Sequence, residues 1–324
     1  MSLYPLKFNP ILKERIWGGE KIKTVLNKDF SPLPNCGESW EISGVDGNVS
    51  VVCNGILKNN SLAELVEIYM GDLVGEKNYE RFGNEFPLLI KFIDSLDNLS
   101  VQVHPDDELS KKRHNAYGKT EMWYVVDAEP GAKLISGFRG EVSKEMYLKA
   151  VEDENVESVL NLVEVAAGDV FFMPAGRVHA IGKGLLVAEI QQTSDVTYRI
   201  YDYKRKDADG NERELHTELA IDAIDYEKID NVRTDYDHKA SDVNIARCNY
   251  FTTNRIFTET EKIRDLAKID SFIIYMCLSG EVDIVDDEGN KETLVKGETV
   301  LIPALVNELR IVPKTMSLLL ETYV

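Results

Sequence analysis

The sequence has few cysteines and no long apolar run. Its four cysteines, Cys36, Cys53, Cys248 and Cys277, lie far apart in 324 residues and form no Cys-x-x-Cys pair. This predicts reduced thiols with packing roles rather than a disulfide framework. No apolar stretch approaches the roughly 18 residues of a membrane span, and the first residues lack the apolar centre of a signal peptide. We therefore expect a cytoplasmic protein with no membrane partner.

A surplus of positive charge is also missing. The chain carries 37 Lys and Arg against 56 Asp and Glu, a formal net charge of −19. Nucleic-acid binding needs basic side chains that displace counterions from phosphates, so this balance argues against a nucleic-acid partner. It disfavours anionic membrane surfaces for the same reason. The length corresponds to roughly two domains at about 150 residues each.

Short β-branched and aromatic runs, separated by Gly, Pro, Asn and Asp, make up most of the chain. This pattern is typical of all-β barrels and sandwiches. We expect strands at residues 41–43, 86–93, 99–103, 122–126, 170–173, 185–191, 273–278, 281–285, 299–302 and 316–321. Helical patterns with capping residues are few, at residues 61–69, 106–113, 143–152 and 216–224. The charged stretch 202–214 reads as a loop, and the polar stretch 231–242 as a seam between two modules.

One short pattern occurs twice. Gly168, Pro174 and His179 recur at the same two intervals as Gly297, Pro303 and Glu308. A Gly turn, a short apolar strand and a Pro that opens the next loop describe one corner of a β-barrel. We therefore predict two similar barrels.

The first copy, Gly-x5-Pro-x-Gly-x2-His, resembles the second motif of the cupin family, whose β-barrels commonly hold a divalent metal. Upstream, Gln102 and His104 alternate on one strand face, and Glu121 opens a later strand. Each histidine alone could be a hydrogen-bonded core residue. Together with Glu121, His104 and His179 form a nitrogen and oxygen donor set that suits Zn²⁺, and also Fe²⁺ or Mn²⁺.

A narrower resemblance covers residues from about 17 to about 202. Its pieces are WGG (17–19), GESWEIS (37–43), FPLLIKFID (86–94), VQVHPDD (101–107), GKTEMWYV (118–125) and EIQQTSDVTYRIYD (189–202). In this order they resemble the shorter bacterial type I mannose-6-phosphate isomerases. The resemblance implies two cupin-type barrels with helical insertions and one Zn²⁺ per chain. It implies zinc ligands at Gln102, His104, Glu121 and His179, and an active-site arginine at Arg199.

The sequence departs from the expected patterns at three places, one of which is Lys183, where the general second cupin motif ends in Asn. Larger members of the isomerase family carry a His directly before the active-site Lys, and here Gly118 precedes Lys119. In the second copy of the repeat, Asn307 and Glu308 stand where the first has Val178 and His179. We therefore expect a catalytic cupin domain at residues 1–240 and a degenerate cupin domain without metal at 241–324.

The implied reaction interconverts mannose 6-phosphate and fructose 6-phosphate through an enediol or enediolate. Arg199 and Lys119 would supply fixed positive charge to the sugar oxygens. Glu189 is our preferred base, because it shares a strand face with Gln191; a zinc-bound water, Asp195 or Lys119 remain open as alternatives.

The substrate would be a small sugar phosphate, contacted by Lys91, Asp195 and Gln191. Lys91 is a lone charge in the apolar run 88–93. A chain of charge −19 cannot steer an anion from afar, so its capture must be local. We expect a monomer or a small homo-oligomer.

Two other functions fit parts of the pattern. One is an iron or manganese cupin enzyme of another class, such as a dioxygenase, which has no need of Lys91, Lys119 and Arg199. The other is a non-catalytic sugar-binding bicupin, which would need neither a divalent metal nor Arg199.

Overall fold

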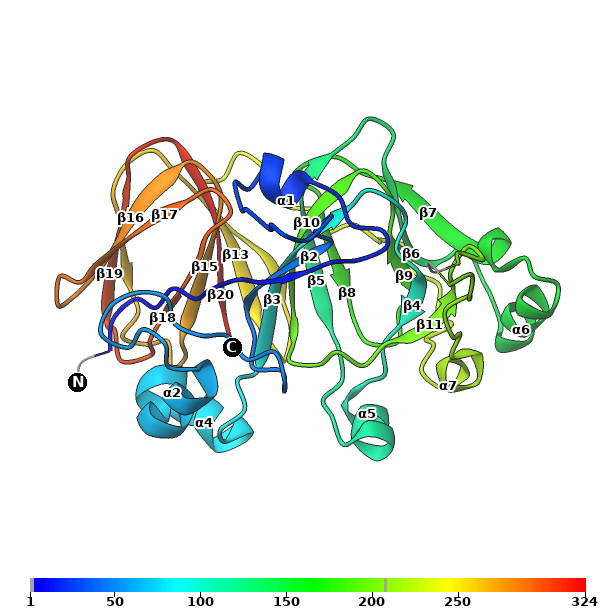
Figure 1. Cartoon of the computed structure of the whole chain (residues 1–324), viewed down its shortest axis with the longest axis horizontal. Helices are drawn as coiled ribbons and strands as arrows, with labels where there is room; N and C mark the ends of the chain where they lie inside the picture. Colours follow the sequence, from blue (N-terminus) through cyan, green and yellow to red (C-terminus); the bar gives the residue numbers. More distant parts are fainter. Residues whose placement is uncertain (1–2, 207–208) are drawn as a thin grey trace.

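Two antiparallel β-barrels lie side by side in the computed structural model, which describes residues 3–206 and 209–324 (Figure 1). Each barrel consists of two facing sheets. The fold is therefore mainly β with two cupin-type barrels, as the sequence predicts.

The first barrel has a six-stranded and a five-stranded sheet. In spatial order the first contains β1 (Ile11–Lys13), β2 (Glu38–Ile42), β3 (Leu88–Ser95), β10 (Leu185–Gln192), β5 (Glu121–Ala128) and β8 (Val170–Met173). The second contains β11 (Tyr198–Tyr201), β4 (Val101–Val103), β9 (His179–Ile181), β6 (Lys133–Phe138) and β7 (Leu160–Glu164).

The second barrel repeats this arrangement with nine strands. One sheet contains β12 (Asp242–Arg247), β13 (Thr252–Thr258), β20 (Ser317–Tyr323), β15 (Ile273–Ser279) and β18 (Thr299–Ile302). The other contains β14 (Lys262–Asp265), β19 (Glu308–Pro313), β16 (Glu281–Asp286) and β17 (Lys291–Val295).

The sequence repeat falls on equivalent strands. Gly168 and Gly297 both have positive φ, +93° and +89°, in the turns that precede β8 and β18. Glu121 pairs with Met173 at the end of β8, and Ile273 pairs with Ile302 at the end of β18. The second barrel therefore has Ile273 at the position of Glu121.

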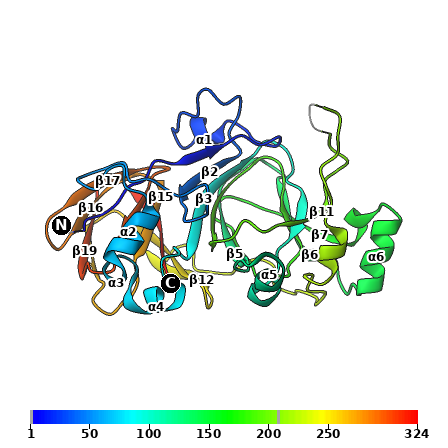
Figure 2. The same ribbon diagram turned by 60° about the horizontal axis from the view of Figure 1, so that its bottom comes forward.

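Helices are short and lie outside the barrels. They are α1 (Lys21–Thr24), α2 (Leu62–Tyr69), α3 (Gly71–Val74), α4 (Glu76–Phe82), α5 (Asp107–His114), α6 (Lys144–Glu152), α7 (Thr217–Ile221) and the 3₁₀ helix η1 (Val156–Val159). Figure 2 shows α2, α3 and α4 beside the second barrel and α6 at the outer end of the first. No helix in the described part of the chain is both long and apolar enough to cross a membrane.

Three of the four predicted helices have their N-cap at the first residue of the expected range. Ser61 and Glu64 form the complete capping box of α2, Asp106 caps α5, and Ser143 caps α6. The fourth helix, α7, ends at Ile221 instead of residue 224. His216 at its N-cap position makes no side-chain capping bond, so this helix has a weaker start signal than the others.

Strands β3 and β10 are buried along their whole length because both faces are covered. Their outward residues, such as Phe92 and Ile190, share one core with Ile274 and Leu320 of the second barrel. Residues of the opposite parity face the interior of the first barrel. Strands β3 and β10 therefore supply both the contact between the two barrels and one wall of the interior of the first barrel.

The N-terminal segment crosses to the second barrel. Leu6 forms two backbone hydrogen bonds with Leu301 in β18, of 2.8 and 2.9 Å. Asp270, beyond β14, accepts a bond from the amide of Glu76 at the start of α4 (2.7 Å). Residues before position 90 thus contact both barrels, and the division at residue 240 stays a prediction.

Candidate active site

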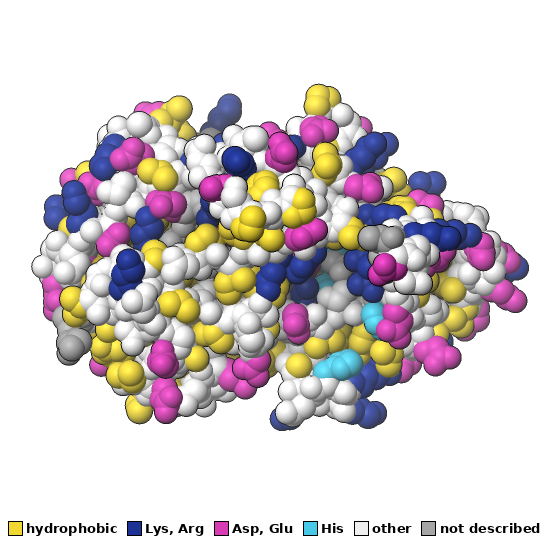
Figure 3. All heavy atoms as spheres, in the orientation of Figure 1, with side chains coloured by type: hydrophobic (Ala, Val, Ile, Leu, Met, Phe, Trp, Pro, Cys, Tyr) yellow, Lys and Arg dark blue, Asp and Glu magenta, His cyan; other side chains and the backbone are white. Residues whose placement is uncertain are grey.

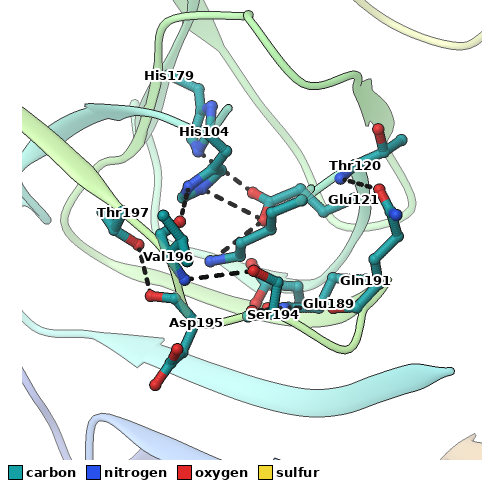
Figure 4. A network of polar contacts seen from close by, with 12 residues as sticks. His104, Thr120, Glu121, His179, Glu189, Gln191, Ser194, Asp195, Val196 and Thr197 are labelled. Atoms are coloured by element: carbon teal, nitrogen blue, oxygen red, sulfur yellow. Dashed lines mark hydrogen bonds and ion pairs between the residues drawn. The ribbon is translucent and has the colours of Figure 1, made fainter. Parts of the chain in front are cut away.

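Three buried side chains converge inside the first barrel. His104 follows β4, Glu121 begins β5 and His179 begins β9. Glu121 lies 3.6 Å from Nε2 of His104 and 3.3 Å from Nε2 of His179. Figure 4 shows both imidazoles directed at the carboxylate. Strands β4 and β9 are adjacent in one sheet and β5 belongs to the other. Together they bring His104 and His179, which are 75 positions apart in sequence, next to Glu121.

The hydrogen bonds around the imidazoles leave one nitrogen of each free. Nδ1 of His104 bonds the carbonyl of Val196 (2.9 Å), and Nδ1 of His179 bonds the carbonyl of Arg177 (2.8 Å). A carbonyl only accepts, so each Nδ1 carries the proton and each Nε2 keeps its lone pair. Both Nε2 atoms and both Glu121 oxygens are buried without a hydrogen-bond partner. Burying lone-pair atoms without a hydrogen-bond partner lowers the stability of the fold unless a cation binds them. This cluster could therefore hold a metal ion.

Protonation also favours a metal site. Burial lowers the pKa of His179 to about 4 and that of His104 well below its ordinary value. Both imidazoles are therefore neutral near pH 7, as ligation requires. Burial, with the nearby charge of Glu189, raises the pKa of Glu121 to about 8 in the metal-free chain. A bound cation would offset this penalty on the carboxylate.

Gln102 lies next to the cluster. It stands directly opposite His179 in the β4–β9 ladder and on the same strand face as His104. Its side chain is half-buried and lines a cavity of about 430 Å³ beside the metal cluster. The predicted fourth ligand is thus within the site, although its role stays a prediction.

This cavity is rich in cations. Six basic side chains line it, against three carboxylates. The cations are Lys13, Arg15, Lys91, Lys119, Arg199 and Arg213. Figure 3 shows Lys and Arg side chains gathered at a hollow near the middle of the face, with a His beside them. An acidic chain therefore concentrates positive charge at one place, as local capture of an anion requires.

Lys91 and Glu189 form the polar centre of the cavity wall. They are cross-strand partners in β3 and β10, and their charged atoms are 3.1 Å apart. Glu189 also accepts a 2.9 Å bond from the indole of Trp123. Burial opposes the charge of Glu189, but Lys91 and Lys119 outweigh it and lower its pKa. Burial likewise opposes the charge of Lys91, yet Glu189 and Glu38 raise its pKa. Both groups are therefore charged near neutral pH.

Gln191 does not line this cavity. It is fully buried, and its amide oxygen accepts a 2.7 Å bond from Lys91. Its amide nitrogen donates to the carbonyls of Gln192 and Ser194. Gln191 thus supports the ammonium of Lys91, and the substrate contact that we predict for Gln191 stays a prediction.

The remaining predicted residues meet at the cavity. Lys119 is buried, and its ammonium lies 3.7 Å from Glu121, so it joins the cavity to the metal cluster. Asp195 is exposed at the rim. Arg199 donates to the carbonyl of Glu214 (2.8 Å), and its Nε is buried without a partner. Burial and the neighbouring Arg213 lower the pKa of Arg199, so this guanidinium lies in an environment suited to an anion.

Sequence reasoning missed three of the cations. Lys13 and Arg15 lie on and just after β1, and Trp17 follows them at the same spacing. The spacing of two residues between Lys13, Arg15 and Trp17 is the signal that could have placed these three side chains on one face. Arg213 gave no such signal, because it lies in the charged loop that also contains Asp202, its ion-pair partner.

The structure explains why position 118 is a glycine. A Cβ at this position would lie 2.6 Å from backbone atoms of both Asp106 and Asp107. The start of α5 therefore fills the space that any side chain would need. This close approach explains why the residue before Lys119 is glycine here, and why a histidine there would require the start of α5 to move.

A larger cavity of about 600 Å³ is lined in part by residues 192–195, of which Asp195 also lines the smaller cavity. The larger cavity is lined by two cations, Arg81 and Lys111, and four carboxylates. This charge balance is unsuited to a phosphate ester, so the 430 Å³ cavity is the better candidate for the active site.

The fold and the site define a bicupin in which the described residues include a buried His–Glu–His cluster that could hold a metal ion, next to a cation-lined cavity. Residues 5–133 match the family model described as phosphomannose isomerase type I, catalytic domain. The mannose-6-phosphate isomerase ManA of Bacillus subtilis is 36% identical over 318 residues, 96% of each chain. The chain therefore belongs to the family of type I mannose-6-phosphate isomerases.

Other relatives agree. The mannose-6-phosphate isomerase of Streptococcus mutans is 41% identical over 224 residues, which are 68% of this chain and 67% of that protein. The crystal structure of the mannose 6-phosphate isomerase from Bacillus subtilis superimposes with a TM-score of 0.86 at 30% identity and covers 99% of both chains.

Proposed function

We propose that this chain interconverts mannose 6-phosphate and fructose 6-phosphate in the cytoplasm, with one zinc ion held by His104, Glu121, His179 and Gln102. The observation that carries the proposal is the set of four orphaned ligand atoms beside a cation-lined cavity. Family membership supplies the substrate pair.

The donor set supports a catalytic metal ion. Two neutral imidazoles, a carboxylate and an amide oxygen suit Zn²⁺, and they also suit Fe²⁺ or Mn²⁺. When bound, such a cation supplies Lewis-acid stabilisation of negative charge on the sugar oxygens. The chain itself supplies the rigid ligand frame, because two backbone carbonyls fix the orientation of His104 and His179.

Glu189 is our proposed proton carrier. Lys91 keeps its carboxylate ionised, which is the state that a proton acceptor needs. In the forward reaction Glu189 would take the proton from C2 of the open-chain aldose. The C2–H electron pair then forms the C1–C2 double bond as the π pair of the C1 carbonyl moves onto O1, which gives an enediolate. The proton of the O2 hydroxyl passes to O1, and Glu189 returns its proton to C1 as the C2 carbonyl forms, which gives the ketose.

Positive charge on the chain would stabilise the enediolate. Lys119 and Arg199 line the cavity with ammonium and guanidinium groups, and both would act as catalytic electrostatic groups. Lys91 forms an ion pair with Glu189 and donates one N–H to Gln191. An ammonium has three N–H donors, so a donor remains available to a phosphate oxygen. Asp195, at the exposed rim, would contact sugar hydroxyls.

The second barrel would have a supporting role. Ile273 and Glu308 occupy the positions equivalent to Glu121 and His179, and Glu308 is exposed. We therefore propose that residues 1–240 form the catalytic domain and that residues 241–324 form a degenerate cupin domain without metal.

Metal removal tests the proposed function directly. Chelation should abolish isomerisation of mannose 6-phosphate, because no other group replaces the lost charge, and added Zn²⁺ should restore it. Elemental analysis should find about one zinc per chain. Full activity in protein with no detectable metal would overturn the mechanism. Turnover restored only by iron, together with oxygen consumption, would instead favour a dioxygenase-like cupin.

Arg199→Ala tests the electrostatic role. Loss of one positioned donor should lower kcat by about 10²-fold to 10³-fold, with a smaller change in KM. Arg199→Lys keeps the positive charge without the guanidinium donor fork, so its kcat should lie between those of the wild type and Arg199→Ala. Coupled assays over a range of mannose 6-phosphate concentrations measure both constants. A rise in KM alone would make Arg199 a phosphate clamp instead.

A further inference from the structure

The three consecutive backbone amides around Lys119 are all held by hydrogen bonds. The amide of Gly118 donates to Oδ1 of Asp107 (2.8 Å), and that of Lys119 to the carbonyl of Pro105 (3.2 Å). The amide of Thr120 donates to the side-chain oxygen of Gln192 (2.8 Å). The backbone of this lysine is therefore fixed on both sides.

Asp107 connects two of these contacts. Its Oδ1 accepts from the amide of Gly118 and also from Nε2 of Gln192 (3.0 Å). Gln192 is buried and bonds Thr120 through its other amide atom. Asp107 and Gln192 thus form one bracket that spans Gly118 to Thr120. Neither residue lines the 430 Å³ cavity.

The second carboxylate oxygen of Asp107 reaches the other barrel. Oδ2 accepts a 2.8 Å bond from the hydroxyl of Tyr250, which lies in the turn between β12 and β13. Arg81 of α4 donates to the carbonyl of Asn249 (3.0 Å) and braces this turn. Burial and the neighbouring Asp107 raise the pKa of Tyr250 to about 12, so the phenol remains a donor at neutral pH.

We propose that Asp107 is a positioning residue for Lys119 and that the second barrel contributes to the reaction through Tyr250. The bracket fixes residues 118–120, which carry Lys119, and the hydroxyl of Tyr250 fixes the bracket. A catalytic group that moves by about 1 Å can lose about 10²-fold in rate, so a distant hydroxyl can affect turnover. This inference rests on the proposed isomerase function.

The test compares four variants of the full zinc-loaded chain. Asp107→Ala should lower kcat by about 30-fold to 100-fold, and Tyr250→Phe by about 3-fold to 10-fold. Asp107→Asn keeps an acceptor for Gly118 and should retain more activity than Asp107→Ala. Tyr79→Phe is the matched control, because its hydroxyl bonds Asn84 at the surface of α4, and it should change kcat less than about twofold.

Three further readouts and a fifth variant, Gly118→Ala, separate the effect of positioning from general damage to the fold. KM for mannose 6-phosphate should change less than about threefold, because the cavity wall is intact, and zinc content should stay near one per chain. Gly118→Ala should also lower kcat while Asp107 remains in place, since its Cβ would displace the same segment. Hydrogen exchange of the amides at 118–120 should quicken in Asp107→Ala and Tyr250→Phe, but not in Tyr79→Phe.

The outcomes distinguish the inference from the proposed function. If the wild-type chain does not isomerise mannose 6-phosphate, the proposed function fails, and amide exchange alone then decides whether the bracket exists. If the wild type is active and Asp107→Ala and Tyr250→Phe keep kcat within twofold, the inference is wrong. A uniform loss of zinc in both variants would also overturn it, because their effect would then act through the metal.

Discussion

Glu121→Gln should release the metal and lower kcat by about 10³-fold or more. The substitution keeps the shape of the side chain but removes the one negative charge among two neutral imidazoles. It also places an amide N–H₂ group toward their free Nε2 atoms. A lost Lewis acid accounts for several kcal/mol of transition-state stabilisation, and each 1.4 kcal/mol is about tenfold in rate.

Elemental analysis and a coupled assay of the same preparation measure this prediction. Glu41→Gln is the matched control, because Glu41 is a buried carboxylate on β2 that pairs with Lys28 (2.8 Å), away from the cavity. This control should keep its zinc and most of its turnover. If Glu121→Gln keeps a full complement of zinc, Glu121 is not a ligand, and the cluster needs another explanation for its orphaned atoms.

The sequence predicts the metal cluster better than it predicts the cavity. His104, Glu121 and His179 belong to spaced motifs, and the barrel brings them together because the end of β4 and the starts of β5 and β9 converge in its interior. The two barrels are likewise predictable from the Gly and Pro repeat, since both glycines occupy turns with positive φ.

The supporting contacts are less predictable because they join residues distant in sequence. Tyr250 reaches Asp107 across 143 positions, and no local pattern distinguishes this tyrosine from the others. Several strands also escape prediction. Lys262–Asp265, for example, is polar and partly exposed at a sheet edge, so neither alternation nor apolar content indicates a strand.

The second barrel contains a feature that sequence alone does not suggest. Glu321 pairs with Tyr275 in the register in which Glu189 pairs with Trp123, so the two glutamates are equivalent. Glu321 accepts a 2.6 Å hydrogen bond from the hydroxyl of Tyr275, and Glu189 accepts a 2.9 Å bond from the indole of Trp123. In the second barrel Arg264 and Asn254 also bind the carboxylate, at 2.5 and 2.9 Å. The acid is present in both barrels, and in the first barrel its carboxylate lines a cation-rich cavity.

Glu189→Gln should lower kcat by about 10²-fold to 10⁴-fold, the usual contribution of a positioned acid or base. The amide keeps an oxygen for Trp123 or Lys91 but cannot accept the C2 proton. Zinc content should be unchanged, because Glu189 is not a proposed ligand. Glu321→Gln removes the equivalent buried carboxylate of the second barrel and should lower stability while leaving kcat within about threefold.

Exchange of the C2 proton with solvent decides the role of Glu189. Mannose 6-phosphate incubated in deuterated buffer should acquire deuterium at C2 with the wild type and with Glu321→Gln, but far more slowly with Glu189→Gln. Because Lys91 loses its charged partner in Glu189→Gln, a changed KM alone would report on phosphate binding and not on proton transfer. Wild-type exchange in Glu189→Gln would exclude it as the base. Asp195 or Lys119, which line the same cavity, would then be the groups to test.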